Sequence, residues 1–195
     1  MVRCERRLIT SWIGTFLSDE IQSLEDDHVK TVYRNSTKGW TKNNRNTQMI
    51  SILLPYDFGS ANFYQRREIT IQNSIEKLKR EKDLIYLFNN MLARSETLRD
   101  YLWVNDDGIV KDTNEVLKIL PKETIISCID WVIRDFWKRQ SGWPDLFIFT
   151  KNDQCFVEVK SPHDELSLEQ MNWFEWAINY SFLKCEICRV KKNLR

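Results

Sequence analysis

The chain has 195 residues, 42% of them hydrophobic and 12% aromatic, a composition that predicts one folded domain over residues 1–195 and excludes a disordered chain. Lys and Arg number 29 against 28 Asp and Glu, so the formal net charge is +1 and any affinity for nucleic acid has to come from a local patch. No apolar run reaches the roughly 20 residues of a membrane span and the N-terminus does not resemble a signal peptide, so we expect an intracellular protein with no membrane partner.

The five cysteines do not form the even, regularly spaced set that a disulfide framework requires. Two of them have the C-x-x-C spacing of a zinc or redox site, but there is no second such pair and the chain has only two histidines. This favours reduced thiols that pack in the core, with a metal or redox role as the weaker alternative. The cysteines are Cys4, Cys128, Cys155, Cys185 and Cys188.

The first predicted element is an amphipathic helix over residues 4–24, where apolar side chains recur at steps of three and four. Glu5 shares the helix face of Ile9 and Trp12 and is therefore expected to point inward, where a lone carboxylate is costly unless it is paired or ligated. The alternative is that Glu5 lies in solvent at a frayed terminus.

A polar, basic loop is predicted for residues 34–48, in which Trp40 is almost the only apolar residue. Trp40 is expected to pin this loop, with stacking on an unpaired base as the alternative. A short apolar element that Pro55 ends comes next. The basic residues of the loop are Arg34, Lys38, Lys42 and Arg45.

Helices are predicted for much of the middle of the chain. Residues 61–92 contain no Gly or Pro and fit one or two helices. Two further amphipathic stretches follow, one over residues 113–120 that Pro121 stops and one over residues 123–139, with Gly142 placed as a C-terminal stop.

After this helical region the hydrophobic period changes to two, in two short runs separated by four polar residues, which predicts a β-hairpin. A turn centred on Asn152-Asp153 would place Asp145 opposite Lys160 and Phe147 opposite Glu158, all on one face. The other face is expected to be a clean apolar surface that helices cover. It is formed by Leu146, Ile148, Val157 and Val159.

Asp145, Glu158 and Lys160 would then bring two carboxylates and an ammonium together on a half-buried surface. Carboxylates at this spacing repel, and a divalent cation is an economical way to hold them ionised; hard oxygen ligands suit Mg²⁺ or Mn²⁺. The alternative is an ordinary strand pair with a surface salt bridge between Asp145 and Lys160.

Ser167 and Gln170 have the spacing of a capping box and predict the start of a helix that continues to about residue 178. A last strand is expected near residues 185–190.

The segment from Pro144-Asp145 to Glu158-Val159-Lys160 resembles the PD-(D/E)xK nuclease pattern, and GWPDLFIF…CFVEVKSPHDELSLEQMNW is similar to the VRR-NUC branch of that superfamily. Two further stretches, ISCIDWVIRDFWKRQSGWPDLF and FYQRREITIQNSIEKL, are similar to the nuclease domain of Fanconi-associated nucleases. The resemblance implies a mixed α/β fold with a restriction-endonuclease-like core, in which helices flank a short central sheet. It also implies a helical insertion at about 60–120, between the first helix and the catalytic hairpin, and a catalytic hairpin and helix at about 143–180.

The same resemblance implies a metal site for Mg²⁺ or Mn²⁺. Its ligands would be Asp145, Glu158 and the main-chain carbonyl of Val159, with Glu5 binding the metal directly or through water.

The implied catalytic residues are Asp145, Glu158, Lys160 and Gln170. Lys160 would orient or deprotonate the attacking water and offset charge in the transition state. Gln170 would position the nucleophile or a phosphate, with a plain capping role as the alternative.

The function that the resemblance implies is a metal-dependent DNA nuclease of the 5′–3′ exonuclease and flap endonuclease type, which acts on flap, nicked or branched DNA in repair. It would work in the nucleus of a eukaryote and otherwise in the cytoplasm. The DNA-binding and helical-repeat modules that precede this domain in full-length relatives are not expected within these residues, so we leave open whether the chain is a stand-alone nuclease or a fragment of a longer protein. Repair-protein partners and a homodimer are also left open. The alternatives are a non-catalytic nuclease-like module that binds DNA or a partner, and a stand-alone dimeric resolvase of four-way junctions.

Basic residues beside the predicted site are the candidates for DNA contacts. Each one taken singly is more often part of a solvated face, and convergence on the side of the metal site would favour DNA binding. The candidates are Arg6, Arg7, Lys42, Lys138 and Arg139, with Lys184, Arg189, Lys191 and Lys192 near the C-terminus.

Overall fold

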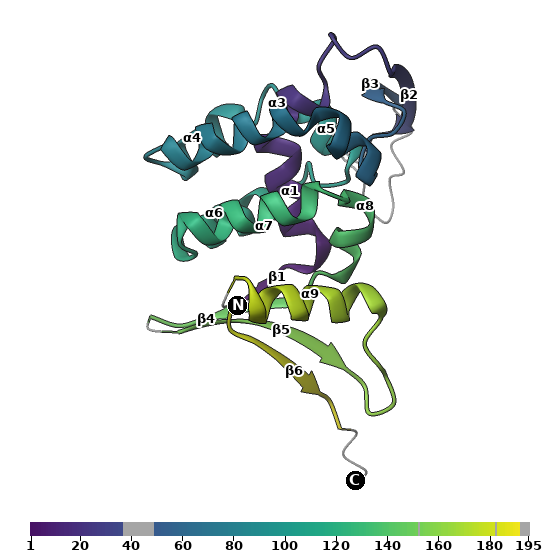
Figure 1. The fold of residues 1–195 in the computed structure, drawn as a ribbon. Helices are drawn as coiled ribbons and strands as arrows, with labels where there is room; N and C mark the ends of the chain where they lie inside the picture. The colour runs from purple at the N-terminus through teal and green to yellow at the C-terminus, as the bar shows by residue number, and fades with distance from the viewer. Residues whose placement is uncertain (37–48, 152, 182, 192–195) are drawn as a thin grey trace. The chain divides into compact units, whose positions relative to one another are not determined.

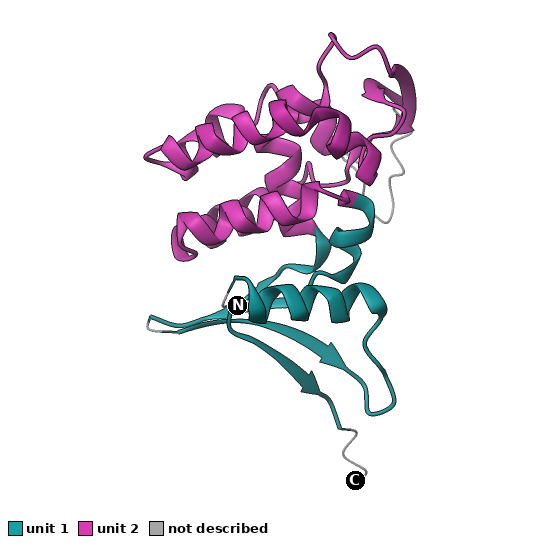
Figure 2. Ribbon diagram, viewed as in Figure 1, with its two compact units in different colours: residues 1–6, 137–195 teal, residues 7–136 magenta. Residues whose placement is uncertain are grey.

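A computed structural model describes residues 1–36, 49–151, 153–181 and 183–191 (Figure 1). The chain divides into two compact units: unit 1 comprises residues 1–6 and 137–195, and unit 2 comprises residues 7–136 (Figure 2). A single domain over the whole chain therefore stays a prediction. No helix in the described part of the chain is long and apolar enough to cross a membrane.

Unit 2 is mainly helical and is built around α1 (Glu5–Phe16), which begins in unit 1 and whose residues 8–16 are all buried. Ser11 of α1 lies 3.2 Å from Thr113, and the ring of Phe16 packs edge-on against Phe88 with centroids 5.7 Å apart. The remaining helices of this unit are α2 (Ser18–Ile21), α3 (Ala61–Arg80), α4 (Leu84–Met91), α5 (Glu96–Tyr101), α6 (Asp107–Ile119) and α7 (Lys122–Ile133), and α8 (Phe136–Arg139) leads into unit 1.

Side-chain caps set the starts of several helices. Ser60, Asp83 and Asp106 accept hydrogen bonds from main-chain N–H groups in the first turns of α3, α4 and α6. The first predicted helix is shorter than expected, because α1 ends at Phe16 and a separate short helix, α2, follows. The stretch 61–92 contains the two helices α3 and α4, as one of the predicted possibilities had it.

A two-stranded antiparallel ribbon of β2 (Val29–Asn35) and β3 (Met49–Pro55) completes unit 2. Ile52 and Leu54 of β3 are buried, and every residue of β2 pairs with a residue of β3, which accounts for the extended conformation of β2. The prediction of a loop from residue 34 is wrong at its start, because Arg34 and Asn35 are the last residues of β2. Residues 37–48, which include Trp40 and Lys42, lie outside the described part of the chain.

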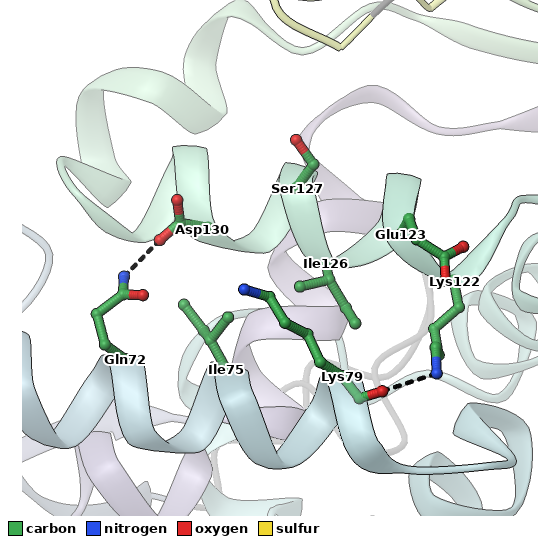
Figure 3. Close-up of a pocket in the computed structure, with 8 residues that line it drawn as sticks. All are labelled: Gln72, Ile75, Lys79, Lys122, Glu123, Ile126, Ser127 and Asp130. Atoms are coloured by element: carbon green, nitrogen blue, oxygen red, sulfur yellow. Dashed lines mark hydrogen bonds between the residues drawn. The ribbon is translucent and has the colours of Figure 1, made fainter.

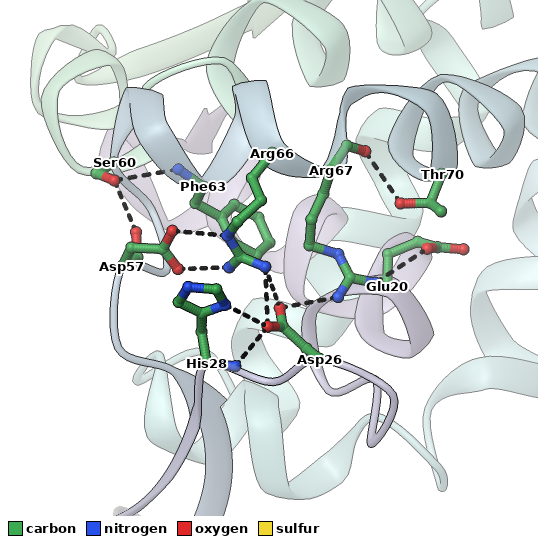
Figure 4. A network of polar contacts seen from close by, with 9 residues as sticks. All are labelled: Glu20, Asp26, His28, Asp57, Ser60, Phe63, Arg66, Arg67 and Thr70. Atoms are coloured by element: carbon green, nitrogen blue, oxygen red, sulfur yellow. Dashed lines mark hydrogen bonds and ion pairs between the residues drawn. The ribbon is translucent and has the colours of Figure 1, made fainter.

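A network of ion pairs centred on Asp26 joins the segment before β2 to the kinked helix α3 (Figure 4). Asp26 accepts hydrogen bonds from Arg66 at 2.8 and 2.9 Å and from Arg67 at 2.9 Å. In a regular helix the side chains of consecutive residues point about 100° apart. The backbone of Arg67 is not helical (φ −115°, ψ 16°), and at this kink the side chains of both Arg66 and Arg67 reach the carboxylate of Asp26.

Unit 1 contains a four-stranded sheet in the order β1-β4-β5-β6, covered on one face by α9 (Leu168–Asn179) (Figure 1). Its strands are β1 (Val2–Arg3), β4 (Leu146–Phe149), β5 (Gln154–Lys160) and β6 (Cys185–Arg189). β1 and β5 pair with β4 in antiparallel orientation, whereas β6 runs parallel to β5 because α9 forms the crossover between them. This arrangement confirms the predicted α/β class, the hairpin, the capped helix and the last strand.

The register of the hairpin differs from the prediction. Leu146 pairs with Val157, and Phe147 pairs with Phe156, so the next pair outward is Asp145 with Glu158. The predicted pairs of Asp145 with Lys160 and of Phe147 with Glu158 are therefore wrong. The turn lies one residue earlier than expected, which moves each partner by two positions. A shift of two positions keeps every side chain on its predicted face, because side chains alternate with a period of two.

The face that α9 covers is also different from the one expected. Phe147 and Phe156 are buried; Phe156 packs against Trp173 of α9 with ring centroids 5.6 Å apart, and Phe147 packs against Phe156 with centroids 4.8 Å apart. Ile148, on the face predicted to be covered, is 38% exposed. The aromatic side chains offer more apolar area than the aliphatic ones, so the helix packs on the face that also carries Glu158.

Candidate active site

The start of the chain is joined by hydrogen bonds to the residues that precede β4. The main-chain N–H groups of Cys4 and Glu5 both donate to the Asp145 carbonyl, at 2.9 and 3.2 Å, and the Cys4 thiol lies 3.1 Å from the Pro144 carbonyl. Burial raises the pKa of the Cys4 thiol well above its usual range, which keeps it protonated as a donor. Glu5 has a positive φ of 32°, an uncommon conformation for a residue with a side chain. These contacts fix the backbone of Asp145.

Asp145 and Glu158 lie next to each other at this end of the sheet. Asp145 Oδ2 accepts a hydrogen bond of 2.9 Å from the main-chain N–H of Val159. Glu158 is only 3% exposed; burial raises the pKa of its carboxyl group, and the neighbouring charge of Asp145 raises it further. The site therefore holds a carboxylate whose ionised form is disfavoured by its surroundings.

Lys160 and Gln170 converge on one oxygen of Glu158. Lys160 Nζ lies 3.1 Å from Glu158 Oε1 and 2.8 Å from Gln170 Oε1, and Gln170 Nε2 donates to the same Glu158 oxygen at 2.5 Å. The second oxygen, Glu158 Oε2, is buried and has no hydrogen-bond partner among the described residues. A buried carboxylate oxygen without a donor is costly unless a ligand completes its environment.

Gln170 is held in place by the first turn of α9. Its main-chain N–H donates to Ser167 Oγ at 3.2 Å and its side-chain Oε1 accepts from the Ser167 N–H at 3.0 Å, which confirms the predicted capping box. The same side chain contacts Glu158 and Lys160, so the capping geometry and the contact with the site occur together.

Gly142 allows α9 to approach the segment before β4. A Cβ atom at this position would lie 2.2 Å from the main-chain oxygen of Glu169, well inside contact distance. The prediction of Gly142 as the stop of the preceding helix is wrong, because it lies in a 3₁₀ turn (Gln140–Gly142) beyond α8. Sequence reasoning missed this close approach and the Cys4 contact, since both partners are distant in the chain.

The donor set fits a hard divalent cation. Asp145 and Glu158 supply carboxylate oxygens at one end of the sheet, and the unpartnered Glu158 Oε2 is the atom that such an ion would satisfy. Glu5 instead pairs with Arg3 at 2.5 Å. In the part of the chain that the structure describes, no three His, Cys, Asp or Glu side chains lie close enough to form a ligand cluster, so the participation of Glu5 stays a prediction.

Several of the candidate DNA contacts lie on the surface. Arg6, Arg7 and Lys138 are exposed, and Arg139 is half-buried in α8. Lys42 lies outside the described residues, as does Lys192. Their convergence on the site stays a prediction.

Unit 2 contains a separate cavity of about 430 Å³ between α3 and α7 (Figure 3). Some of its polar groups are engaged with the protein: Gln72 donates to Asp130 at 2.6 Å, and Lys122 donates to the Lys79 carbonyl at 2.8 Å. None of the predicted site residues that the structure describes lines this cavity. The predicted catalytic residues Asp145, Glu158, Lys160 and Gln170 lie instead in unit 1.

Comparisons with known proteins agree with the resemblance. The VRR-NUC domain family matches residues 75–192. Among curated relatives, Fanconi-associated nuclease 1 homologs of Caenorhabditis briggsae and Dictyostelium discoideum are 24% identical over 144 residues and 28% identical over 157 residues. These alignments cover 70% and 71% of this chain but only 16% and 14% of the relatives, so the chain spans a small part of their length.

Solved structures show the same fold. A crystal structure of paFAN1 bound to 5′-flap DNA with a one-nucleotide flap and a gap has a TM-score of 0.72 and 19% sequence identity. It covers all of this chain, which corresponds to 32% of that protein. A second structure of paFAN1, with a two-nucleotide flap, also has a TM-score of 0.72.

Proposed function

Because the chain belongs to the VRR-NUC domain family, whose match covers more than half of its length, we propose that it is a metal-dependent DNA nuclease that hydrolyses phosphodiester bonds. The observation that carries this proposal is the buried, unpartnered Glu158 Oε2 beside Asp145, with Lys160 and Gln170 on the other oxygen. A purely structural carboxylate in this position would be expected to have both oxygens satisfied.

Asp145 and Glu158 are the proposed metal ligands. The carbonyl of Val159 is a further candidate: its N–H points toward Asp145, and the N–H and C=O groups of one strand residue face the same edge. Glu5 would join the site directly or through water, after leaving Arg3. Bound Mg²⁺ or Mn²⁺ would neutralise the scissile phosphate and lower the pKa of an attacking water.

Lys160 acts on the water and the transition state in this proposal. Its ammonium is held by Gln170 and Glu158, which aims it at the position beside the two carboxylates. From there the ammonium can orient the water and offset the negative charge that develops on the phosphate. Deprotonation of the water by Lys160 would require the neutral amine, which forms when the ammonium gives up a proton. Gln170 holds the side chains of Lys160 and Glu158 in place by hydrogen bonds to both, and it is the second polar group that could contact the nucleophile.

The proposed substrate is 5′-flap, nicked or branched DNA, cut in the manner of a 5′–3′ exonuclease and flap endonuclease during DNA repair. The support is that the paFAN1 structures similar in fold hold 5′-flap DNA. Such a nuclease of a eukaryote would work in the nucleus. Because the chain corresponds to 32% of paFAN1, its substrate choice would depend on further domains or repair-protein partners.

The decisive experiment is incubation of the purified chain with labelled flap, nicked, four-way and blunt duplex DNA in the presence of Mg²⁺, Mn²⁺ or EDTA. We expect cleavage with either metal and none with EDTA. Binding of flap DNA without cleavage would favour a non-catalytic module. Paired symmetric cuts of the four-way junction, together with a dimer mass in solution, would favour a resolvase.

The ligand assignment is tested by calorimetry with Mn²⁺. Asp145→Ala and Glu158→Ala should lose Mn²⁺ binding and cleavage together, whereas Lys160→Ala should keep Mn²⁺ binding and lose rate by roughly 10²- to 10⁴-fold, because the ammonium acts on the water. Glu165→Gln, an exposed carboxylate in the loop before α9, is the matched control and should behave as wild type. Equal Mn²⁺ affinity in wild type and Asp145→Ala would contradict the assignment.

A further inference from the structure

The end of α5 has an unusual residue in its terminal turn. Trp103 has a φ of +64°, and the N–H of Trp103 donates to the Asp100 carbonyl at 3.0 Å while that of Val104 donates to the Arg99 carbonyl at 2.8 Å. This pair of bonds is the Schellman motif, in which the left-handed position is usually Gly because a side chain is strained there. The backbone thus carries a cost that glycine would avoid.

Burial does not offset this cost, because Trp103 is 49% exposed. Its indole is instead held by Arg34 at the end of β2, whose guanidinium carbon lies 4.7 Å from the indole centroid. The same guanidinium lies 5.3 Å from the ring centroid of Tyr101 and donates to the Tyr101 carbonyl at 2.6 Å. All three residues belong to unit 2.

The result is a half-exposed indole ring beside a fixed positive charge. Aromatic rings of this kind stack on nucleobases in proteins that bind single strands, and a neighbouring Arg adds a cation–π contribution and attraction to phosphate. Bulky residues in strained conformations at exposed positions are also concentrated at functional sites. A single half-exposed ring offers one stacking face, which matches one base rather than a duplex backbone.

We propose that Trp103 and Arg34 form a stacking platform for an unpaired nucleobase of the DNA substrate. The choice of DNA as the partner rests on the proposed nuclease function. The platform would hold a base that has no complement, such as one in a flap or a gap, and would contribute to the preference for such DNA over a continuous duplex.

Trp103→Gly separates this role from packing. Glycine relieves the left-handed strain, so the urea midpoint of unfolding should stay the same or rise, whereas a ring needed for packing would lower it. Binding is measured by fluorescence anisotropy in EDTA with a labelled 5′-flap DNA, the same flap with abasic positions, and a blunt duplex. We expect Trp103→Gly to weaken binding to the intact flap by roughly 5- to 150-fold, the range for the loss of one stacked base.

Two controls complete the test. Trp103→Phe keeps an aromatic face and should retain most of the flap affinity. The abasic flap and the blunt duplex should bind wild type and Trp103→Gly equally. Equal affinity of the two proteins for the intact flap would overturn the platform, as would a loss in Trp103→Gly that is the same for intact and abasic flaps.

The failure of the platform is distinguishable from failure of the nuclease function. If wild type cuts flap DNA with Mg²⁺ and Trp103→Gly binds that flap as tightly, only the platform is wrong. If wild type neither binds nor cuts any DNA, the nuclease proposal fails and the platform falls with it. Binding of Trp103 to an aromatic or arginine-rich peptide in place of any DNA would assign the surface to a protein partner and would also overturn the proposal.

Discussion

Asp26 in unit 2 and Glu158 in unit 1 are both buried carboxylates, with exposed fractions of 7% and 3%, in opposite environments. Burial alone would raise the pKa of Asp26, but hydrogen bonds from the His28 N–H and from Arg66 and Arg67 outweigh it and lower the pKa to about 2 (Figure 4). For Glu158, burial dominates and the pKa is raised, although Lys160 and Gln170 oppose the shift.

The difference separates a carboxylate that stabilises the fold from one that is available to a ligand. Asp26 Oδ1 accepts hydrogen bonds from Arg66 and the His28 N–H, and Oδ2 accepts from Arg66 and Arg67. Both oxygens are therefore satisfied, and the group adds to folding stability at neutral pH. Glu158 keeps one buried oxygen without a partner among the described residues, so its ionised form costs stability until a cation arrives. Asp26→Ala and Glu158→Gln test this contrast directly, and Gly142→Ala tests the position of Gln170, which contacts Glu158.

The largest effect is expected from Asp26→Ala. Removal of the carboxylate leaves two partly buried arginines without their shared partner, which should lower the free energy of unfolding by about 3–5 kcal/mol. Urea denaturation followed by tryptophan fluorescence measures it. Asp27→Ala, one residue away and exposed, is the control and should change stability by less than about 0.5 kcal/mol.

The stability difference between wild type and Asp26→Ala should depend on pH. The pKa of Asp26 in the folded protein is about 2, below its ordinary value of 3.8, so its contribution is present at neutral pH and is lost as the pH falls from about 4 toward 2. The difference between wild type and Asp26→Ala should therefore shrink over that interval. A difference that is constant down to pH 2 would contradict the ion-pair explanation.

A smaller effect is expected from Gly142→Ala. The added methyl group would meet the main chain of Glu169, so the first turn of α9 has to move, at a cost of about 1–3 kcal/mol. Because Gln170 is in that turn, cleavage should fall as well, measured by flap cleavage at a temperature where the variant is fully folded. Gly108→Ala adds the same group near the start of α6 and should leave cleavage unchanged. If Gly142→Ala cleaved DNA at the wild-type rate, the position of α9 would not matter for cleavage.

The smallest effect is expected from Glu158→Gln in EDTA. At neutral pH the neutral amide avoids a buried charge, so this variant should be more stable than wild type by about 1 kcal/mol. Because the pKa of Glu158 is raised, the carboxylate of wild type becomes protonated as the pH falls through that pKa, and the cost of the buried charge disappears. The free energies of unfolding of the two proteins should therefore become equal in mild acid. Added Mn²⁺ should reverse the order by stabilising only wild type. A Glu158→Gln protein that is less stable at neutral pH would show that the carboxylate is structural.

Much of the candidate site is local in the sequence and could be predicted from it. The Ser167–Gln170 spacing defines the start of α9, and the alternation within the hairpin places Asp145, Glu158 and Lys160 on one face whatever the turn. The exact pairing could not be predicted, because a turn of polar residues allows neighbouring centres with similar energy.

The remaining features depend on contacts between distant parts of the chain. Nothing near Asp26 in the sequence indicates that Arg66 and Arg67 will reach it, since 40 residues separate the closer pair. Residues 34–35 are polar and read as loop, yet pairing with β3 makes them strand. The role of Trp103 could not be predicted from the sequence, because its positive φ is known only from the structure.

The hydrogen bond between Cys4 and Pro144 joins residues 140 positions apart, and this separation has a consequence for how the chain folds. Closure of a flexible loop of that length costs about 4 kcal/mol in entropy, and non-local contacts of this kind form slowly. Unit 2 lies within the loop and consists largely of helices with local contacts, so it can fold while the rest of the chain is still being synthesised. Because the strand Val2–Arg3 can pair only after β4 has been made, we expect the edge that carries Asp145 and Glu158 to become ordered last.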